Sequence, residues 1–102
     1  MKKAKLLPKD RKILERLGEN LKYARKRRSL TAEMLSERAN ISRSTLWSLE
    51  SGKSNVSIES LLNVLSALGL QDDLSNIGAD DILGRKLQDA KLLRPKRNPK
   101  KR

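Results

Sequence analysis

The feature that most constrains the fold is a regular alternation of helix-start and helix-stop residues between Leu30 and Leu70. Hydroxyl residues that cap helix N-termini are each followed, after about ten residues, by an Asn or Gly that accepts a left-handed backbone. The three pairs are Thr31 with Asn40, Ser42 with Gly52, and Ser57 with Gly69. They predict three short helices, at Ala32–Ala39, at Arg43 to Glu50 or Ser51, and at Ile58–Leu68.

Apolar residues recur at three- and four-residue spacing, as on one face of a helix. A longer helix is expected over Lys9–Arg28, with Pro8 near its start, where a helix tolerates proline. Its expected apolar face comprises Ile13, Leu14, Leu17, Leu21 and Ala24. The stripe expected on the helix that Ser57 caps comprises Ile58, Leu61, Leu62, Leu65 and Leu68. Beyond Gly69 the weaker pattern predicts a short helix at Asp73–Ile77 and another at Asp80–Leu93, where Ile82, Leu83, Leu87 and Ala90 are apolar.

These segments predict an all-α fold, a compact bundle of about five short helices. The chain of 102 residues has 36% hydrophobic residues and no Phe, so its core is expected to be small and aliphatic. We expect a basic N-terminal arm at 1–8, a helical domain at 9–78, a helical extension at 79–93 and a disordered basic tail at 94–102.

The positive charge is concentrated at the two ends of the chain. Residues 1–28 contain twelve basic and three acidic residues, a net of +9, and residues 85–102 contain nine and one, a net of +8. The middle, 29–84, contains three and eight, a net of −5. Two basic arms around a compact centre suit phosphate contacts on either side of a reading element. The alternative is that the charged ends are only solvated and solubilising.

Several classes of function lack the residues that they need. Because the chain has no Cys and no His, thiol chemistry, zinc fingers and the usual neutral-pH proton shuttle are excluded. No nucleophile–base pair, phosphate loop or metal cluster can be assembled, so we expect neither an enzyme nor a cofactor. No apolar run is long enough for a membrane span or a signal peptide, so a cytoplasmic protein without a membrane partner is expected.

The centre of the sequence predicts a helix-turn-helix unit, with the turn at Asn40–Ser42. Residues expected to point inward are Leu35, Ala39, Ile41, Leu46 and Leu49. This leaves Arg43, Ser44, Trp47 and Ser48 on the outer face of a helix short enough to enter a DNA major groove.

The stretch from Leu21 to Leu70 resembles the Cro/cI-type (Xre) helix-turn-helix domain, which has the lambda-repressor-like fold. The resemblance implies that the third helix is the recognition helix of a homodimer bound to a palindromic operator in double-stranded DNA. It implies base-reading roles for Arg43, Ser44 and Ser48, and phosphate contacts for Ser42, Thr45 and Lys53. It also implies a buried ion pair between Arg25 and Glu50, against the alternative of two unrelated surface charges.

The chain departs from the family pattern at three positions. Ala32 stands where the family usually has a Gln that bonds a phosphate and braces the recognition helix, so one anchor is missing. Asn40 replaces the turn glycine, which the turn tolerates, and Val56 replaces a frequent Pro, to which we attach no function.

Two aromatic residues and two pairs of acids allow more than one interpretation. Trp47 contacts a thymine methyl or the sugar backbone in the groove, or else packs partly against a neighbouring helix. Tyr23 is expected to pack on the first helix. The neighbouring acids Asp72/Asp73 and Asp80/Asp81 are expected to cap helix N-termini rather than to bind a metal.

Together these features predict a sequence-specific repressor whose helix-turn-helix DNA-binding domain is residues 9–78 and which dimerises through Leu70–Leu87. Size and layout further suggest a HipB-like antitoxin that represses its own operon and contacts a HipA-like kinase toxin. The alternative is a stand-alone phage or chromosomal repressor of the same family. A basic RNA-binding protein is a more remote alternative, because it explains the basic ends but not the helix-turn-helix spacing.

Overall fold

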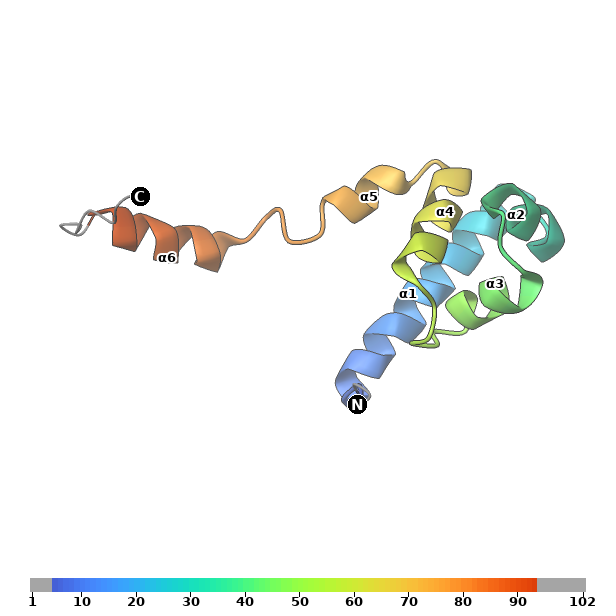
Figure 1. Ribbon diagram of the computed structural model, residues 1–102, viewed down its shortest axis with the longest axis horizontal. Helices are drawn as coiled ribbons and strands as arrows, with labels where there is room; N and C mark the ends of the chain where they lie inside the picture. Colours follow the sequence, from blue (N-terminus) through green and yellow to red (C-terminus); the bar gives the residue numbers. More distant parts are fainter. Residues whose placement is uncertain (1–4, 94–102) are drawn as a thin grey trace.

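The computed structural model describes residues 5–93, which form six α-helices and no β-strand (Figure 1). The helices are α1 (Pro8–Arg27), α2 (Ala32–Ala39), α3 (Arg43–Glu50), α4 (Ile58–Leu68), α5 (Gln71–Ser75) and α6 (Ile82–Leu93). The all-α prediction is confirmed for this part of the chain. The expected disorder of the tail, 94–102, and the first four residues of the expected N-terminal arm lie outside the described residues.

The predicted caps are formed at the starts of α2, α3 and α4. The hydroxyls of Thr31, Ser42 and Ser57 each accept a hydrogen bond from a backbone N–H three residues on, at 3.0 Å in every case. These bonds satisfy N–H groups that a helix leaves unpaired in its first turn. Since the predicted caps fix the register, α2 and α4 have the expected bounds.

The predicted stops are also formed. Asn40, Gly52 and Gly69 have φ of 56°, 79° and 78°, and two backbone hydrogen bonds close each end in the Schellman pattern. α1 ends in the same way at Ser29, whose φ is 56° although it is not a glycine. There Leu30 N–H donates to Arg25 O at 3.2 Å and Ser29 N–H to Lys26 O at 2.9 Å.

The two C-terminal helices are displaced from their predicted bounds. α5 begins at Gln71 rather than Asp73, and α6 begins at Ile82 rather than Asp80. The start of α6 is set by Asp81, whose carboxylate accepts a hydrogen bond from Gly84 N–H at 3.0 Å and so caps the helix.

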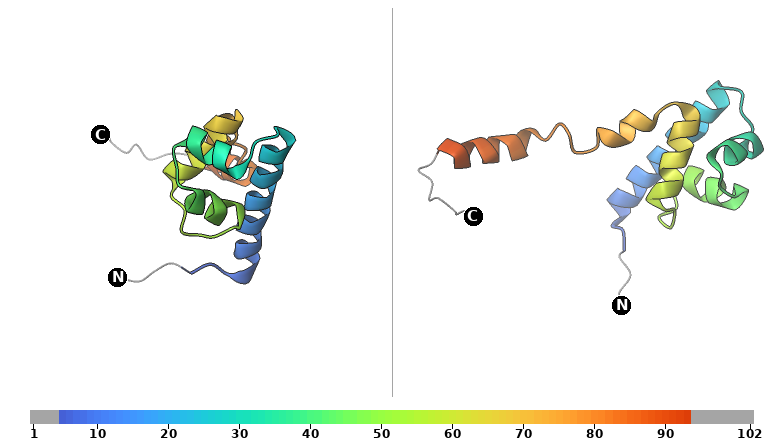
Figure 2. Two further views of the ribbon diagram at one scale, coloured as in Figure 1. Left: turned by 90° about the vertical axis from the view of Figure 1, so that its right-hand side faces the viewer. Right: turned by 45° about the horizontal axis from the view of Figure 1, so that its top comes forward.

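The core is small and aliphatic, as expected, and lies where α1, α2, α3 and α4 meet. α2 packs on α3 and α4, α1 packs on α3, and α5 packs on α4. The left view of Figure 2 shows α1 standing along one side of this body. The buried apolar side chains are those of Leu21, Ala24, Leu30, Leu35, Ala39, Leu46, Leu49, Val64, Leu65 and Leu68.

The prediction of which residues form the apolar faces of α1 and α4 is partly wrong. Ile58 is 74% exposed, and Ile13 and Leu62 are also exposed, whereas Val64 is fully buried. α4 turns Val64, Leu65 and Leu68 inward because α2 packs against it there. Tyr23 lies on α1 and was expected to take part in the packing of that helix, but its side chain is half-exposed.

Gly18 allows α1 and α3 to approach each other at backbone distance. A Cβ atom at Gly18 would lie 2.7 Å from the carbonyl oxygen of Glu50 and would also overlap the carbonyl oxygen of Leu49. The turn after α3 is equally close, since a Cβ at Gly52 would lie 2.6 Å from Glu15 Cα. The end of α3 is therefore pressed against the middle of α1 without intervening side chains.

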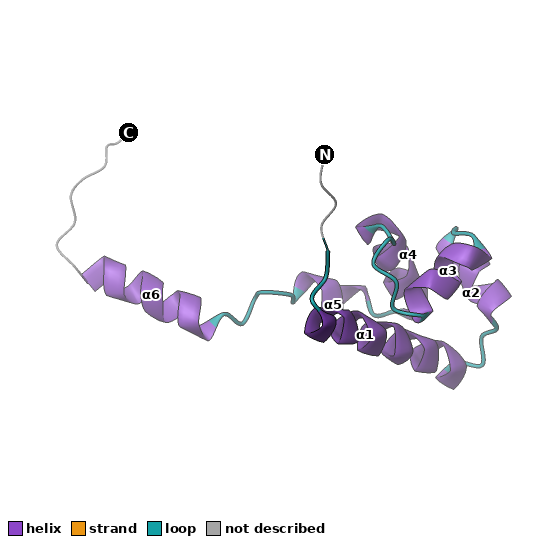
Figure 3. Cartoon of the chain, turned by 90° about the horizontal axis from the view of Figure 1, so that it is seen from below, coloured by secondary structure: helices purple, strands orange, loops and turns teal. Residues whose placement is uncertain are grey.

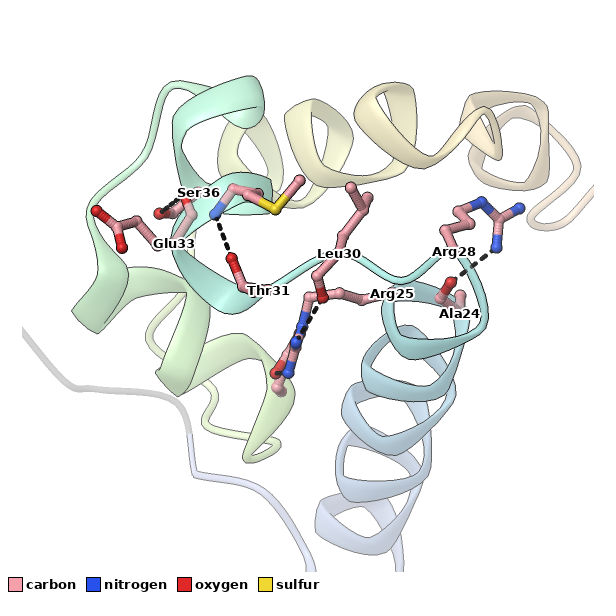
Figure 4. A network of polar contacts seen from close by, with 9 residues as sticks. Ala24, Arg25, Arg28, Leu30, Thr31, Glu33 and Ser36 are labelled. Carbon is pink, nitrogen blue, oxygen red and sulfur yellow. Dashed lines mark hydrogen bonds and ion pairs between the residues drawn. The ribbon is translucent and has the colours of Figure 1, made fainter.

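Arg25 and Glu50, expected as an ion pair, are in contact and join α1 to the end of α3. Arg25 Nε and Nη2 donate to the two carboxylate oxygens of Glu50 at 2.8 Å and 3.0 Å. Arg25 Nη1 donates to Leu30 O at 3.0 Å, which holds the α1–α2 turn in place (Figure 4). The two side chains are only 10% and 9% exposed. Hydrogen bonding to Glu50 raises the pKa of Arg25 above its usual value, against the opposing effect of burial.

α6 stands apart from the body and gives the molecule an elongated shape (Figure 1). The radius of gyration is 18.9 Å, against about 13 Å for a compact domain of 100 residues. Figure 3 shows α2 and α3 beside α1 at one end, and α6 beyond the other helices at the opposite end. The expected compact bundle thus describes α1–α5, and α6 projects from it.

We expect Gly18→Ala to destabilise the fold by about 1–3 kcal/mol, because the added methyl group meets backbone that cannot yield. This loss exceeds the roughly 1 kcal/mol that Ala gains over Gly inside a helix. Urea denaturation followed by circular dichroism measures it. Gly84→Ala is the matched control, since its Cβ meets only the Asp81 side chain, which can rotate away at the cost of the α6 cap and without touching the core. A Gly18→Ala protein as stable as the original would contradict the close approach.

We expect Glu50→Ala to lower the free energy of unfolding by about 3–5 kcal/mol, because it leaves the Arg25 guanidinium buried without its partner. The double variant Arg25→Met/Glu50→Leu removes both charges and is expected to recover part of that loss. The recovery is incomplete because Leu30 O also loses its donor. Equal stabilities of the single and double variants in thermal unfolding would refute the pairing.

Candidate nucleic-acid interface

The turn between α2 and α3 fixes the angle at which α3 is presented. Asn40 takes the left-handed conformation, and Ile41 N–H donates to Ser36 O at 3.0 Å, which closes the end of α2. Ile41 is half-buried against the core. Leu46 and Leu49 hold the inner side of α3 in the core, as predicted. The unit of two short helices and a three-residue turn is therefore a helix-turn-helix.

The outer face of α3 consists of Arg43, Ser44 and Trp47, which are exposed. Positions 43 and 47 are one turn apart, and 44 lies beside them, so the three side chains form one continuous surface. Ser48 is half-buried at the edge of this surface. Of the four residues predicted to read bases, three thus stand fully on the outer face and one at its border.

Trp47 is 62% exposed, so packing against a neighbouring helix does not cover most of its ring. The Lys53 ammonium lies 5.6 Å from the ring centroid, a distance at which a cation is attracted to an aromatic face. Lys53 and Trp47 were predicted separately, as a phosphate contact and a base contact. The structure brings them together at the end of α3.

A hollow of about 480 Å³ lies beside the outer face, between α1, the start of α2 and α3. Arg43, Ser44 and Trp47 line one side of it, and Lys22 and Ala32 line the others. Ala32 is the position at which the family pattern has a longer side chain, Gln, that braces the recognition helix. The short Ala side chain leaves this space open.

Lys22 is a functional candidate that the sequence analysis missed. It lies on α1, one turn before Arg25, and lines the hollow beside Arg43. The predicted Arg25–Glu50 pair already placed this part of α1 against α3. A residue three positions earlier on the same face was therefore detectable from that pair.

The hydroxyl group of Ser42 is occupied within the protein. Ser42 Oγ accepts from Thr45 N–H at 3.0 Å and donates to Thr45 Oγ1 at 2.9 Å. Ser44 Oγ lies 3.1 Å from the same Ser42 oxygen. The predicted phosphate contact of Ser42 would therefore compete with this cap, whereas Thr45 Oγ1 only accepts that bond and keeps its own hydrogen to donate. The backbone N–H groups of Arg43 and Ser44, which the first turn of a helix leaves unpaired, are further donors.

The paired acidic residues lie at the starts of the two C-terminal helices. Asp81 caps α6 as expected, whereas Asp72 and Asp73 lie in the first turn of α5 without capping it. In residues 5–93, no cluster of acidic residues could hold a metal ion. Within the same range, every helix is too short or too polar to cross a membrane.

Comparison with known proteins agrees with this geometry. The family model of the helix-turn-helix domain matches residues 16–76, which is more than half of the chain. An "Immunity repressor protein" of Bacillus phage phi105 is 44% identical over 55 residues, which are 54% of this chain and 38% of the relative. The chain thus matches well under half of that relative's length. From the matched range and the fold, the chain belongs to the helix-turn-helix family of DNA-binding regulators.

Proposed function

We propose that the protein is a sequence-specific transcriptional repressor that binds a two-fold symmetric operator as a homodimer. The observation that carries the proposal is the exposed surface of Arg43, Ser44 and Trp47 on a short helix held by a helix-turn-helix turn. A guanidinium in the first turn of such a helix can bond guanine O6 and N7 in the major groove. The indole ring supplies an apolar contact for a thymine methyl.

The basic groups around this surface would hold the DNA backbone. Lys22, on α1, lines the hollow beside Arg43 and Trp47, and Lys53, in the turn after α3, lies over the Trp47 ring. Phosphate contacts of this kind position a reading helix but do not discriminate between sequences. In the proposed division of roles, the bases are read by Arg43, Ser44, Trp47 and Ser48. The DNA backbone is contacted by Lys53, Ser42 and Thr45.

The similarity to an immunity repressor favours a stand-alone repressor over an antitoxin. The relative's name supports repression, and nothing in the comparisons supports a HipA-like kinase partner. We therefore prefer a stand-alone phage-type or chromosomal repressor to a HipB-like antitoxin. Because the chain matches 38% of that relative, its regulatory role is inferred from the shared helix-turn-helix region alone.

We expect Arg43→Ala to weaken binding to the selected operator by about 1–3 kcal/mol, or roughly 5- to 150-fold in Kd, and to relax preference at one base pair. Affinity for a scrambled duplex is expected to change little. The operator comes from selection on random duplexes, and quenching of Trp47, the only tryptophan, reports binding.

Arg43→Lys is the matched control for Arg43→Ala, because it keeps the charge but replaces the planar fork of the guanidinium with a single ammonium. If Arg43 reads a base, Arg43→Lys keeps the affinity for the scrambled duplex and loses only part of the discrimination, since an ammonium also donates to guanine O6 and N7. An Arg43→Ala protein weakened equally on both duplexes would make Arg43 a phosphate contact.

We expect Lys53→Gln to weaken binding to operator and scrambled DNA alike. The slope of log K against log salt concentration should flatten by about 0.9, which corresponds to one phosphate contact. Lys53→Arg retains the charge beside Trp47 and should keep the original slope. An unchanged slope in the Gln variant would place Lys53 away from the DNA.

A further inference from the structure

An apolar groove runs between α1, α4 and α5, on elements that the proposed reading surface does not use. Its volume is about 500 Å³. Most of its lining consists of the apolar side chains of Leu17, Leu61, Leu65, Leu70, Leu74 and Ile77. Ile77, at the open end, is 73% exposed. Nothing in residues 5–93 fills this groove.

The same chain carries an unpartnered apolar helix. Ile82, Leu83, Leu87 and Ala90 fall on one side of α6, and all four are exposed. Lys86 falls among them, and its long aliphatic stem can lie along an apolar surface while its ammonium reaches water. Leu83 alone is 68% exposed. A helix this short is not stable in water by itself, and an apolar face normally packs against another element. One copy of the protein thus holds both an empty apolar groove and an uncovered apolar helix.

We propose that α6 of one copy occupies the α1/α4/α5 groove of a second copy, so that two chains exchange their C-terminal helices. Helix exchange of this kind is a low-cost route to a two-fold dimer, because each copy buries the same helix in the same groove. This inference rests on the proposed homodimer and names the surfaces that form it. It extends the dimer segment expected from the sequence, Leu70–Leu87, to α1 and α4.

Charges at the edges of the groove and of α6 are complementary. The groove carries Arg27 on its α1 side and Asp73 on its α5 side. On α6, helical spacing places Asp89 at one edge of the apolar face and Lys91 at the other. With its apolar face in the groove, α6 can therefore set Asp89 against Arg27 and Lys91 against Asp73.

This pairing also defines a register. Arg27 and Asn20 are seven residues apart on α1, and Asp89 and Ile82 are also seven apart on α6, so each pair lies on one side of its helix. At 1.5 Å per residue, both separations are about 10 Å. If Asp89 meets Arg27, Ile82 therefore lies level with Asn20, which lines the groove.

The connection to α6 favours a second copy over the chain's own groove. Ile77 N–H donates to Leu74 O at 3.3 Å, and Ala79 N–H donates to Asn76 O at 3.1 Å. Arg85 Nη2 then donates to Ala79 O at 2.7 Å, which fastens the first turn of α6 to this connection. These bonds direct α6 away from its own α1 and α4, as Figures 1 and 2 show.

The area available is sufficient for a specific interface. α6 has 12 residues, so it is about 18 Å long and about 10 Å wide. Burying half of its surface and the matching groove in both copies removes roughly 1,100 Å² from water, just above the roughly 1,000 Å² expected of a specific interface.

Disulfide trapping tests the exchange, because the natural chain has no Cys to interfere. Asn20→Cys in one chain and Ile82→Cys in a second chain of different tag length are mixed and mildly oxidised without DNA. The mixed disulfide should form at least about tenfold faster than in the controls, since docked thiols meet at millimolar effective concentration. Glu19→Cys replaces Asn20→Cys in one control, because Glu19 lines a different hollow. Gln88→Cys replaces Ile82→Cys in the other, because position 88 lies opposite the apolar face of α6.

Three results would overturn the proposal. A dominant disulfide between two Ile82→Cys chains would show that α6 pairs with α6. An internal disulfide in the Asn20→Cys/Ile82→Cys double variant, formed at high dilution, would place α6 in its own groove. Mixed disulfides that form no faster than in the controls would show that α6 of the second copy does not occupy the groove. Operator binding measured on the same reduced proteins tests the proposed function separately, so either can fail without the other.

Discussion

The three hydrogen bonds of the Arg25 guanidinium are the interaction on which the rest of the structure depends. Two of them hold the Glu50 carboxylate, and the third holds Leu30 O. One side chain on α1 thereby fixes both the last residue of α3 and the turn that leads into α2. Because the core contains only aliphatic side chains, which pack without directional preference, the orientation of α3 has to come from directional bonds such as these.

Close backbone contact makes that orientation rigid. The carbonyl groups of Leu49 and Glu50 rest on Gly18, and the turn at Gly52 rests on Glu15, so α1 supports α3 at successive turns. A buried ion pair contributes little net stability by itself, since desolvation offsets most of the attraction. Its contribution here is to geometry. It selects one arrangement of α3 on α1 among the several that an aliphatic interface would accept.

Local chemistry explains why much of the fold and part of the site could be predicted from the sequence. The bounds of α2, α3 and α4 are determined almost to the residue by the caps Thr31, Ser42 and Ser57 and by the stops Asn40 and Gly69. This is so because a cap acts within one turn. The same periodicity placed Arg43, Ser44 and Trp47 outside. The prediction erred where contact between elements decides, as at Val64, which is fully buried in the core, and at Ile58, which is exposed. The Lys53–Trp47 contact and the position of Lys22 beside the reading surface likewise depend on how separate parts of the chain meet, which periodicity does not describe.

α1 connects the proposed reading surface to the proposed dimer surface. Lys22 and Arg25 face α3 and the hollow beside it, whereas Leu17, Asn20 and Arg27 face the groove, so the two surfaces lie on different sides of one helix. A dimeric repressor needs its two recognition helices about 34 Å apart, one helical turn of DNA. If α6 of the partner seats in the groove, that spacing is set by the width of the body between groove and α3. Gly18 and the Arg25–Glu50 pair hold this width constant, because both fix α3 on α1. The residues that orient the reading helix would then also determine the operator spacing that the dimer accepts, although none of them touches the groove.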